Sequence, residues 1–93
     1  MPPNRRRKVK THTFNGKRYG IYFGPLKGVT DVCRRANLEL FVRTVGTSER
    51  DILDTTIHEA LHACDWDASE SKVKKTATDI SRFLWRLGYR RLK

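Results

Sequence analysis

The chain has 93 residues and a mass of 10.9 kDa, which suits a single domain and excludes a multidomain enzyme. Hydrophobic residues make up 38% and charged residues 32%, which excludes a disordered chain. No run approaches the roughly 18 apolar residues of a membrane span, and the basic start lacks the apolar core of a signal peptide. With only two cysteines, Cys33 and Cys64, we expect a cytoplasmic protein in a reducing compartment.

The net charge of +10 is concentrated in the first half of the chain. Residues 1–43 carry a net charge of +9, and residues 44–93 carry +1. We expect residues 1–8 to be a flexible basic tail and residues 9–93 to form one domain. A basic run of this kind often contacts nucleic acid or another polyanion. The residues in this prediction are Arg5, Arg6, Arg7, Lys8 and Lys10.

The first half of the domain has the pattern of β-structure. Residues 9–14 and 17–23 flank Asn15-Gly16, the dipeptide that favours a two-residue type I′ hairpin turn. Residues 38–45 alternate in polarity and predict a third strand, ended by Gly46.

The second half predicts two helices. Ser48 and Asp51 form a capping pattern for a helix that runs to about residue 66, with Cys64 on its apolar, buried side. Asp67 and Glu70 form a second capping pattern, as N-cap and third helical residue, for a helix that ends near Leu87. Because the connection is short, we expect an antiparallel helix pair. The predicted fold is α+β: a small three-stranded, mainly antiparallel sheet with a two-helix hairpin.

The first helix contains the motif H-E-x-x-H. His58 and His62 are four residues apart, so on a helix their imidazoles point the same way and can bind one zinc ion. Zinc lowers the pKa of its bound water, so the adjacent Glu59 suffices as general base. This pattern predicts hydrolysis by an activated water, with zinc polarising a carbonyl oxygen.

A catalytic zinc requires a third protein ligand, and several residues are candidates for it. A third histidine at the metzincin spacing is absent, because Ala68 occupies that position. Asp79, on the predicted second helix, is the preferred ligand, since an antiparallel partner helix would bring it near the histidines. Glu70 is the first alternative, followed by Asp65 or Asp67, and then His12 or no third ligand at all.

The segments TTIHEALHACDWD and ATDISRFLWRLGYRR, with the basic start and the hairpin before them, resemble small phage-type H-E-x-x-H zinc peptidase-like proteins. More distantly the chain is similar to the minimal cores of SprT-like and minigluzincin metallopeptidases. The resemblance covers about residues 14–91 and is specific over residues 55–67. It implies a minimal zincin-like core with one zinc held by His58 and His62, Glu59 as catalytic base, and, for a phage protein, the host cytoplasm as its location.

The sequence thus predicts a zinc peptidase whose substrate is a protein or peptide, and the basic front half favours an acidic or DNA-associated one. Residues 38–45 could offer a sheet edge along which an extended substrate pairs. One alternative function is a nucleic-acid-binding module with a structural zinc, and another is an adaptor or inhibitor on a decayed protease fold. No membrane partner is expected, and the sequence leaves the oligomeric state open.

Overall fold

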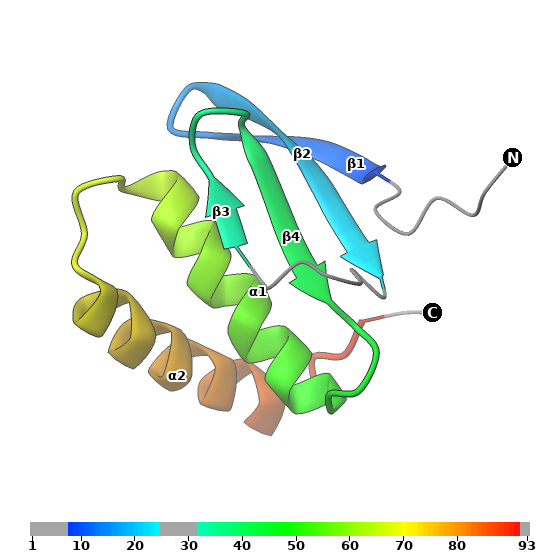
Figure 1. The fold of residues 1–93 in the computed structure, drawn as a ribbon. Helices are drawn as coiled ribbons and strands as arrows, with labels where there is room; N and C mark the ends of the chain where they lie inside the picture. Colours follow the sequence, from blue (N-terminus) through cyan, green and yellow to red (C-terminus); the bar gives the residue numbers. More distant parts are fainter. Residues whose placement is uncertain (1–7, 25–31, 92–93) are drawn as a thin grey trace, which may run out of the picture.

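A computed structural model of the chain describes residues 8–24 and 32–91. Four strands and two helices follow one another along the chain (Figure 1). They are β1 (Lys8–Phe14), β2 (Lys17–Gly24), β3 (Val32–Arg34), β4 (Glu39–Arg43), α1 (Glu49–Cys64) and α2 (Glu70–Arg86). The predicted α+β fold with a two-helix hairpin is confirmed. The predicted basic tail lies outside the described residues except for Lys8, which begins β1.

The hairpin predicted from Asn15-Gly16 is present. Asn15 has φ 48° and Gly16 has φ 78°, so both turn residues adopt the positive φ that a type I′ turn requires. The turn pairs β1 with β2 in antiparallel register, with Phe14 opposite Lys17 and Thr11 opposite Gly20.

The sheet contains one strand more than the three predicted, and it is mixed. Its order is β1-β2-β4-β3, with β4 parallel to β2 and antiparallel to β3. β3 is only three residues long, and the glycines and the proline before it conceal it in the sequence. Because β4 is a central strand, the expectation that residues 38–45 offer a free edge was wrong.

Both helices begin at serine caps. The Ser48 side chain accepts a hydrogen bond from the backbone N–H of Asp51 at 3.1 Å, as predicted for α1. In α2 the cap is Ser69, which accepts from the N–H of Lys72 at 3.2 Å. The predicted cap at Asp67 was therefore wrong, and Glu70 is the first helical residue rather than the third.

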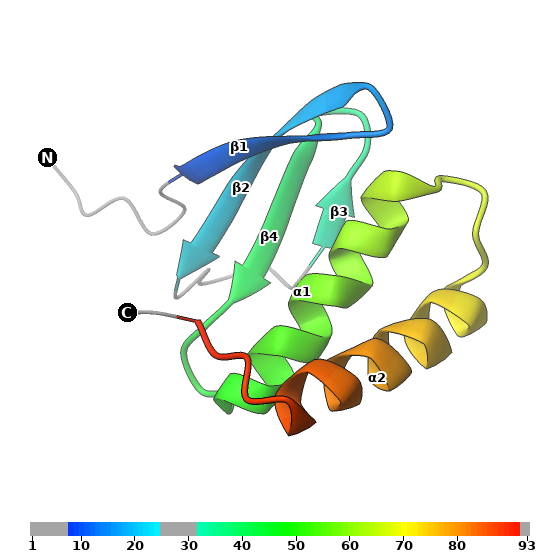
Figure 2. The same cartoon turned by 180° about the vertical axis from the view of Figure 1, so that it is seen from behind.

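The helices lie on one side of the sheet, and α1 separates α2 from it (Figures 1 and 2). The core between sheet and α1 is formed by alternate residues of two strands and one helix residue: Tyr19, Ile21, Leu40, Val42 and Ala63. On the opposite side of the sheet, Tyr22 and Phe41 stack with ring centroids 4.8 Å apart.

Cys64, predicted to be buried, is exposed, because α1 turns Ala63 rather than Cys64 toward the strands. Within the described residues, neither helix has the length and apolar character needed to cross a membrane.

We expect the substitution Leu40→Ala to destabilise the fold by about 2–5 kcal/mol, because Leu40 is 2% exposed in the core and its truncation leaves a cavity. The matched control is Leu87→Ala at a side chain that is 58% exposed, for which a change within about 0.5 kcal/mol is expected. Urea unfolding followed by circular dichroism measures both. Equal effects of the two substitutions would contradict the assignment of this core.

Candidate metal centre

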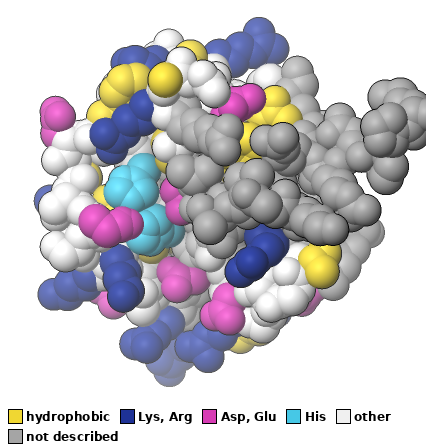
Figure 3. Space-filling model, in the orientation of Figure 1, with side chains coloured by type: hydrophobic (Ala, Val, Ile, Leu, Met, Phe, Trp, Pro, Cys, Tyr) yellow, Lys and Arg dark blue, Asp and Glu magenta, His cyan; other side chains and the backbone are white. Residues whose placement is uncertain are grey.

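The two motif histidines lie one turn apart on α1, on the side that faces the start of α2. Their ring centroids are 5.0 Å apart, and their side chains are 21% and 17% exposed for His58 and His62 respectively. Figure 3 shows histidine side chains beside a carboxylate at the molecular surface. The pair is therefore held by the helix and accessible to an ion from solvent.

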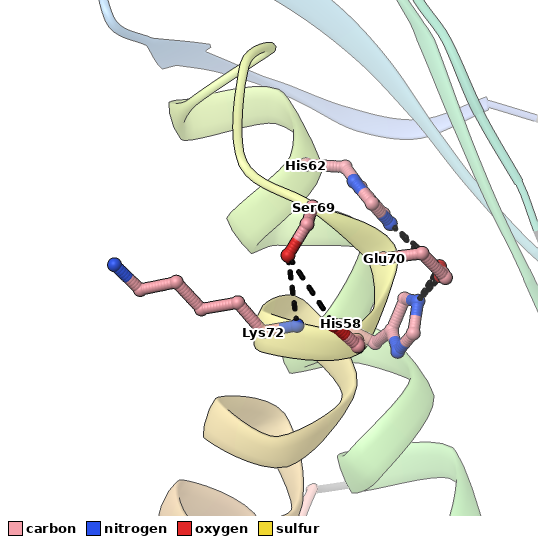
Figure 4. A network of polar contacts seen from close by, with 6 residues as sticks. His58, His62, Ser69, Glu70 and Lys72 are labelled. Carbon is pink, nitrogen blue, oxygen red and sulfur yellow. Dashed lines mark hydrogen bonds and ion pairs between the residues drawn. The ribbon is translucent and has the colours of Figure 1, made fainter.

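Glu70, the first residue of α2, brings its carboxylate to both imidazoles (Figure 4). Its Oε1 lies 2.6 Å from Nε2 of His58 and 3.2 Å from Nε2 of His62. Its Oε2 lies 3.3 Å from each of the same two nitrogens. Three side chains from two helices thus lie close together. Each offers one potential ligand atom, and these three atoms are all within 4.8 Å of one another.

The chemistry and spacing of these three groups fit a zinc site. Two imidazoles and one carboxylate form a ligand set found at catalytic zinc, where a fourth position stays open. Two ligands at about 2.0–2.1 Å from a tetrahedral ion lie about 3.3 Å apart. Three of the four N···O distances, between 3.2 and 3.3 Å, already match this separation. His58, His62 and Glu70 are therefore positioned to hold a metal ion.

The other candidates for the third ligand are elsewhere. Asp79, the preferred one, is exposed and lies nine residues beyond Glu70 on α2, or about 13 Å along the helix axis. Asp65 is the C-cap of α1 and accepts from the N–H of Asp67. His12 contacts Phe14 on β1, with ring centroids 4.7 Å apart. In the described part of the chain, the structure brings only the alternative, Glu70, to the histidine pair.

The position of Glu70 also sets its charge. The hydrogen bond from His62 is the main cause that lowers the pKa of Glu70 below its usual value. Partial burial opposes this shift, and the contact with His58 adds to it. The carboxylate is thus ionised at neutral pH, which is the form that binds a cation. Because the Glu70 side chain is 63% exposed, the contact adds little to the stability of the fold.

The motif glutamate lies on a different side of α1. Glu59 is 8% exposed and lies one helical turn before Ala63, the α1 residue that packs in the core against the sheet, so it is on the sheet-facing side of α1. Burial beside the histidine pair is unusual for a carboxylate, because carboxylates are rarely buried without a specific partner or role. Glu59 is thus positioned next to the candidate metal centre but separately from the ligand set.

Sequence reasoning missed the contacts that Tyr19 of β2 makes with residues distant in the chain. Tyr19, fully buried, accepts a hydrogen bond at 2.8 Å from Nε1 of Trp66, and Cys33 packs against the core cluster that contains Tyr19. Burial, the main cause, raises the pKa of Tyr19 and that of Cys33. Lys17 and Arg35 lie over the Trp66 ring, 5.0 and 5.6 Å from its centroid. No local pattern in the sequence connects residues 19, 33 and 66.

The predicted polyanion contact is not part of this centre. Arg5, Arg6 and Arg7 lie outside the described residues, and Lys10 is exposed on β1. This contact stays a prediction.

We expect Glu70→Gln to weaken the binding of Zn²⁺ by at least about 100-fold, since loss of even an outer-shell partner costs about 10–100-fold. Asp79→Asn is the matched control, with the same change from carboxylate to amide on the same helix, and should bind as the unaltered chain does. Isothermal titration with Zn²⁺ measures both. The assignment of Glu70 fails if Asp79→Asn has the larger effect.

We also expect Cys33 to react with the thiol reagent DTNB at least about tenfold more slowly than Cys64 at pH 8. The thiolate is the reactive form, and the raised pKa of Cys33 reduces its thiolate fraction while Cys64 is exposed. Stopped-flow absorbance on Cys33→Ser and Cys64→Ser variants assigns each rate. Cys64→Ser retains only Cys33, and Cys33→Ser retains only Cys64. Equal reaction rates of the two variants would contradict the partial burial of Cys33.

Comparisons with protein-family models, with curated proteins and with solved structures find no match to this chain. The functional interpretation therefore depends on the residues of the site and their geometry.

Proposed function

We propose that the chain is a minimal zinc-dependent peptidase in which His58, His62 and Glu70 bind the metal and Glu59 is the general base. The observation that carries this proposal is the contact of one carboxylate from α2 with both imidazoles of the H-E-x-x-H motif. This motif alone provides two ligands, and Glu70 completes the three that a catalytic zinc needs.

The arrangement favours a catalytic rather than a purely structural metal. Structural zinc sites are closed by four ligands, commonly cysteines, whereas the group formed by the described residues has three members and no cysteine. When bound, zinc lowers the pKa of a coordinated water and polarises the carbonyl group to be attacked.

Glu59 is the residue to which we assign proton transfer. It is adjacent to a ligand in sequence, and its burial keeps the carboxylate in a fixed position and partly shielded from bulk water. In this role its carboxylate accepts a proton from the attacking water and returns it to the leaving amine, as general acid–base catalysis requires.

An extended peptide is the substrate that the fold suits best. β3 is an edge of the described sheet and packs against α1, the helix that carries the H-E-x-x-H motif. A peptide paired with this edge would carry its backbone carbonyls past the candidate metal centre. Substrate pairing is thus assigned to β3 and not to residues 38–45.

We expect Glu59→Gln to lower the hydrolysis of a fluorescence-quenched peptide library by about 10²–10⁴-fold while the chain still binds one Zn²⁺, because the substitution removes the base and keeps the ligands. Asp79→Asn is the control and should hydrolyse the library at the unaltered rate. Zinc content is measured by atomic absorption on the same samples. Unchanged hydrolysis in Glu59→Gln would remove Glu59 as base, and a zinc-loaded chain without any hydrolysis would contradict the peptidase assignment.

A further inference from the structure

A second region of interest lies at the opposite end of the helix pair from His58 and His62. A cavity of about 880 Å³ opens there between the start of α1, the end of α2 and the segment that follows α2. Its walls are largely apolar, with Phe23, Ile52, Leu53, Leu84, Trp85 and Tyr89 among the lining residues. This volume is in the range of ligand-binding pockets, and neither motif histidine lines it.

Exposed apolar side chains extend from the cavity along the outer side of α2. Phe83 is 61% exposed, Leu87 58% and Tyr89 61%, and Ile80 is also exposed. These are four of the six large hydrophobic side chains that are exposed among the described residues. Such a concentration is typical of an interaction surface, whereas scattered exposed apolar residues need no explanation.

Arginines border these apolar side chains. Arg82 and Arg86 are exposed one turn apart on α2, and Arg90 and Arg91 line the cavity. Arg90 stacks on the Trp85 ring at 3.3 Å and donates to the backbone carbonyl of the same residue, and Arg91 lies 4.5 Å from the ring centroid of Phe23. None of the four forms an ion pair within the described part of the chain. Two carboxylates lie nearby, Asp79 on α2 and Glu49 in the cavity wall.

We propose that this region, the α2 end surface (the cavity together with Ile80, Phe83, Leu87, Tyr89 and the four arginines), docks an acidic amphipathic helix of a protein partner. An amphipathic helix places apolar side chains at every third or fourth residue, which suits an apolar stripe that leads into a cavity. Carboxylates flanking that stripe would pair with the arginines, which are well suited to bidentate contacts with carboxylates.

The same features argue against other occupants. A second copy of the chain carries the same net charge of +10 and the same arginines, so self-association brings like charges together. A nucleic acid would satisfy the arginines but leave the apolar side chains without partners. A flat anionic bilayer would not fill a concave cavity, whereas protruding side chains of a helix would.

The experiment uses a fluorescein-labelled 18-residue peptide with leucine or phenylalanine at positions i, i+3, i+4 and i+7 and glutamate on both flanks. We expect saturable binding to the full chain by fluorescence anisotropy, with affinity falling as salt rises. The double substitutions Phe83→Ser/Leu87→Ser and Arg82→Glu/Arg86→Glu should each weaken binding at least about tenfold. Lys74→Glu/Lys75→Glu makes the same change in net charge at exposed residues of α2 outside the surface and should alter binding less than about twofold.

Three further samples decide between the proposal and its alternatives. A peptide with lysine in place of glutamate should not bind, and amide NMR shifts on adding the acidic peptide should concentrate in residues 80–91. His58→Ala and Glu59→Gln should bind as the unaltered chain does, which separates this surface from the proposed peptidase site. The proposal is overturned if the control double substitution weakens binding as much as the others do, or if His58→Ala abolishes binding. It is also overturned if duplex DNA or phosphatidylserine vesicles bind more tightly than the peptide and that binding is lost in Phe83→Ser/Leu87→Ser. Dimerisation that buries this surface, seen by sedimentation velocity, would do the same.

Discussion

The contact between the Glu70 carboxylate and the two imidazoles of α1 is the interaction on which the functional interpretation depends. It joins the last turns of one helix to the first residue of the next. The contact is possible because Ser69 caps α2, so that Glu70 is its first residue and lies beside the preceding helix. A helix that started two residues earlier would rotate this side chain by about 200°, away from the histidines.

Each of the two carboxylates near the histidines has a different environment, and the fold produces this difference. Glu70 is exposed and its pKa is lowered by its histidine partners, which suits a metal ligand. Glu59 is buried on the side of α1 that faces the sheet, an environment that would suit the proton transfer proposed for it. α1 can supply both environments because it lies between the sheet and α2, so that one side of the helix packs on the strands and another faces α2.

Local signals in the sequence were sufficient for most of the fold and for part of the site. The Asn15-Gly16 turn, the Ser48 cap and the spacing of His58 and His62 each depend on residues within a few positions of one another, and the structure has all three. The structure places Glu70, and not the preferred Asp79, beside the histidine pair, and the sequence ranked them otherwise because Asp67 and Ser69 are both acceptable N-caps. Choosing Asp67 gave Glu70 a capping role and left Asp79 as the free carboxylate.

The remaining differences come from contacts between distant segments. β3 is too short to show a pattern of its own and is defined by its pairing with β4. The parallel pairing of β2 with β4 made the latter a central strand, which no periodicity within residues 38–45 reveals. The packing of Tyr19 against Cys33 and Trp66 likewise depends on tertiary structure.

The candidate metal centre and the environment of Glu59 also differ in how far apart in the sequence their contributing residues lie. The three candidate metal ligands span only residues 58–70, so the loop that an ion would close between them is short and its conformational entropy cost is small. The setting of Glu59 depends instead on strands formed some 20 to 40 positions earlier in the chain. During folding, the helical hairpin can therefore bring the three candidate ligands together before the sheet is complete, whereas Glu59 would reach its buried environment last, when the non-local strand pairings form.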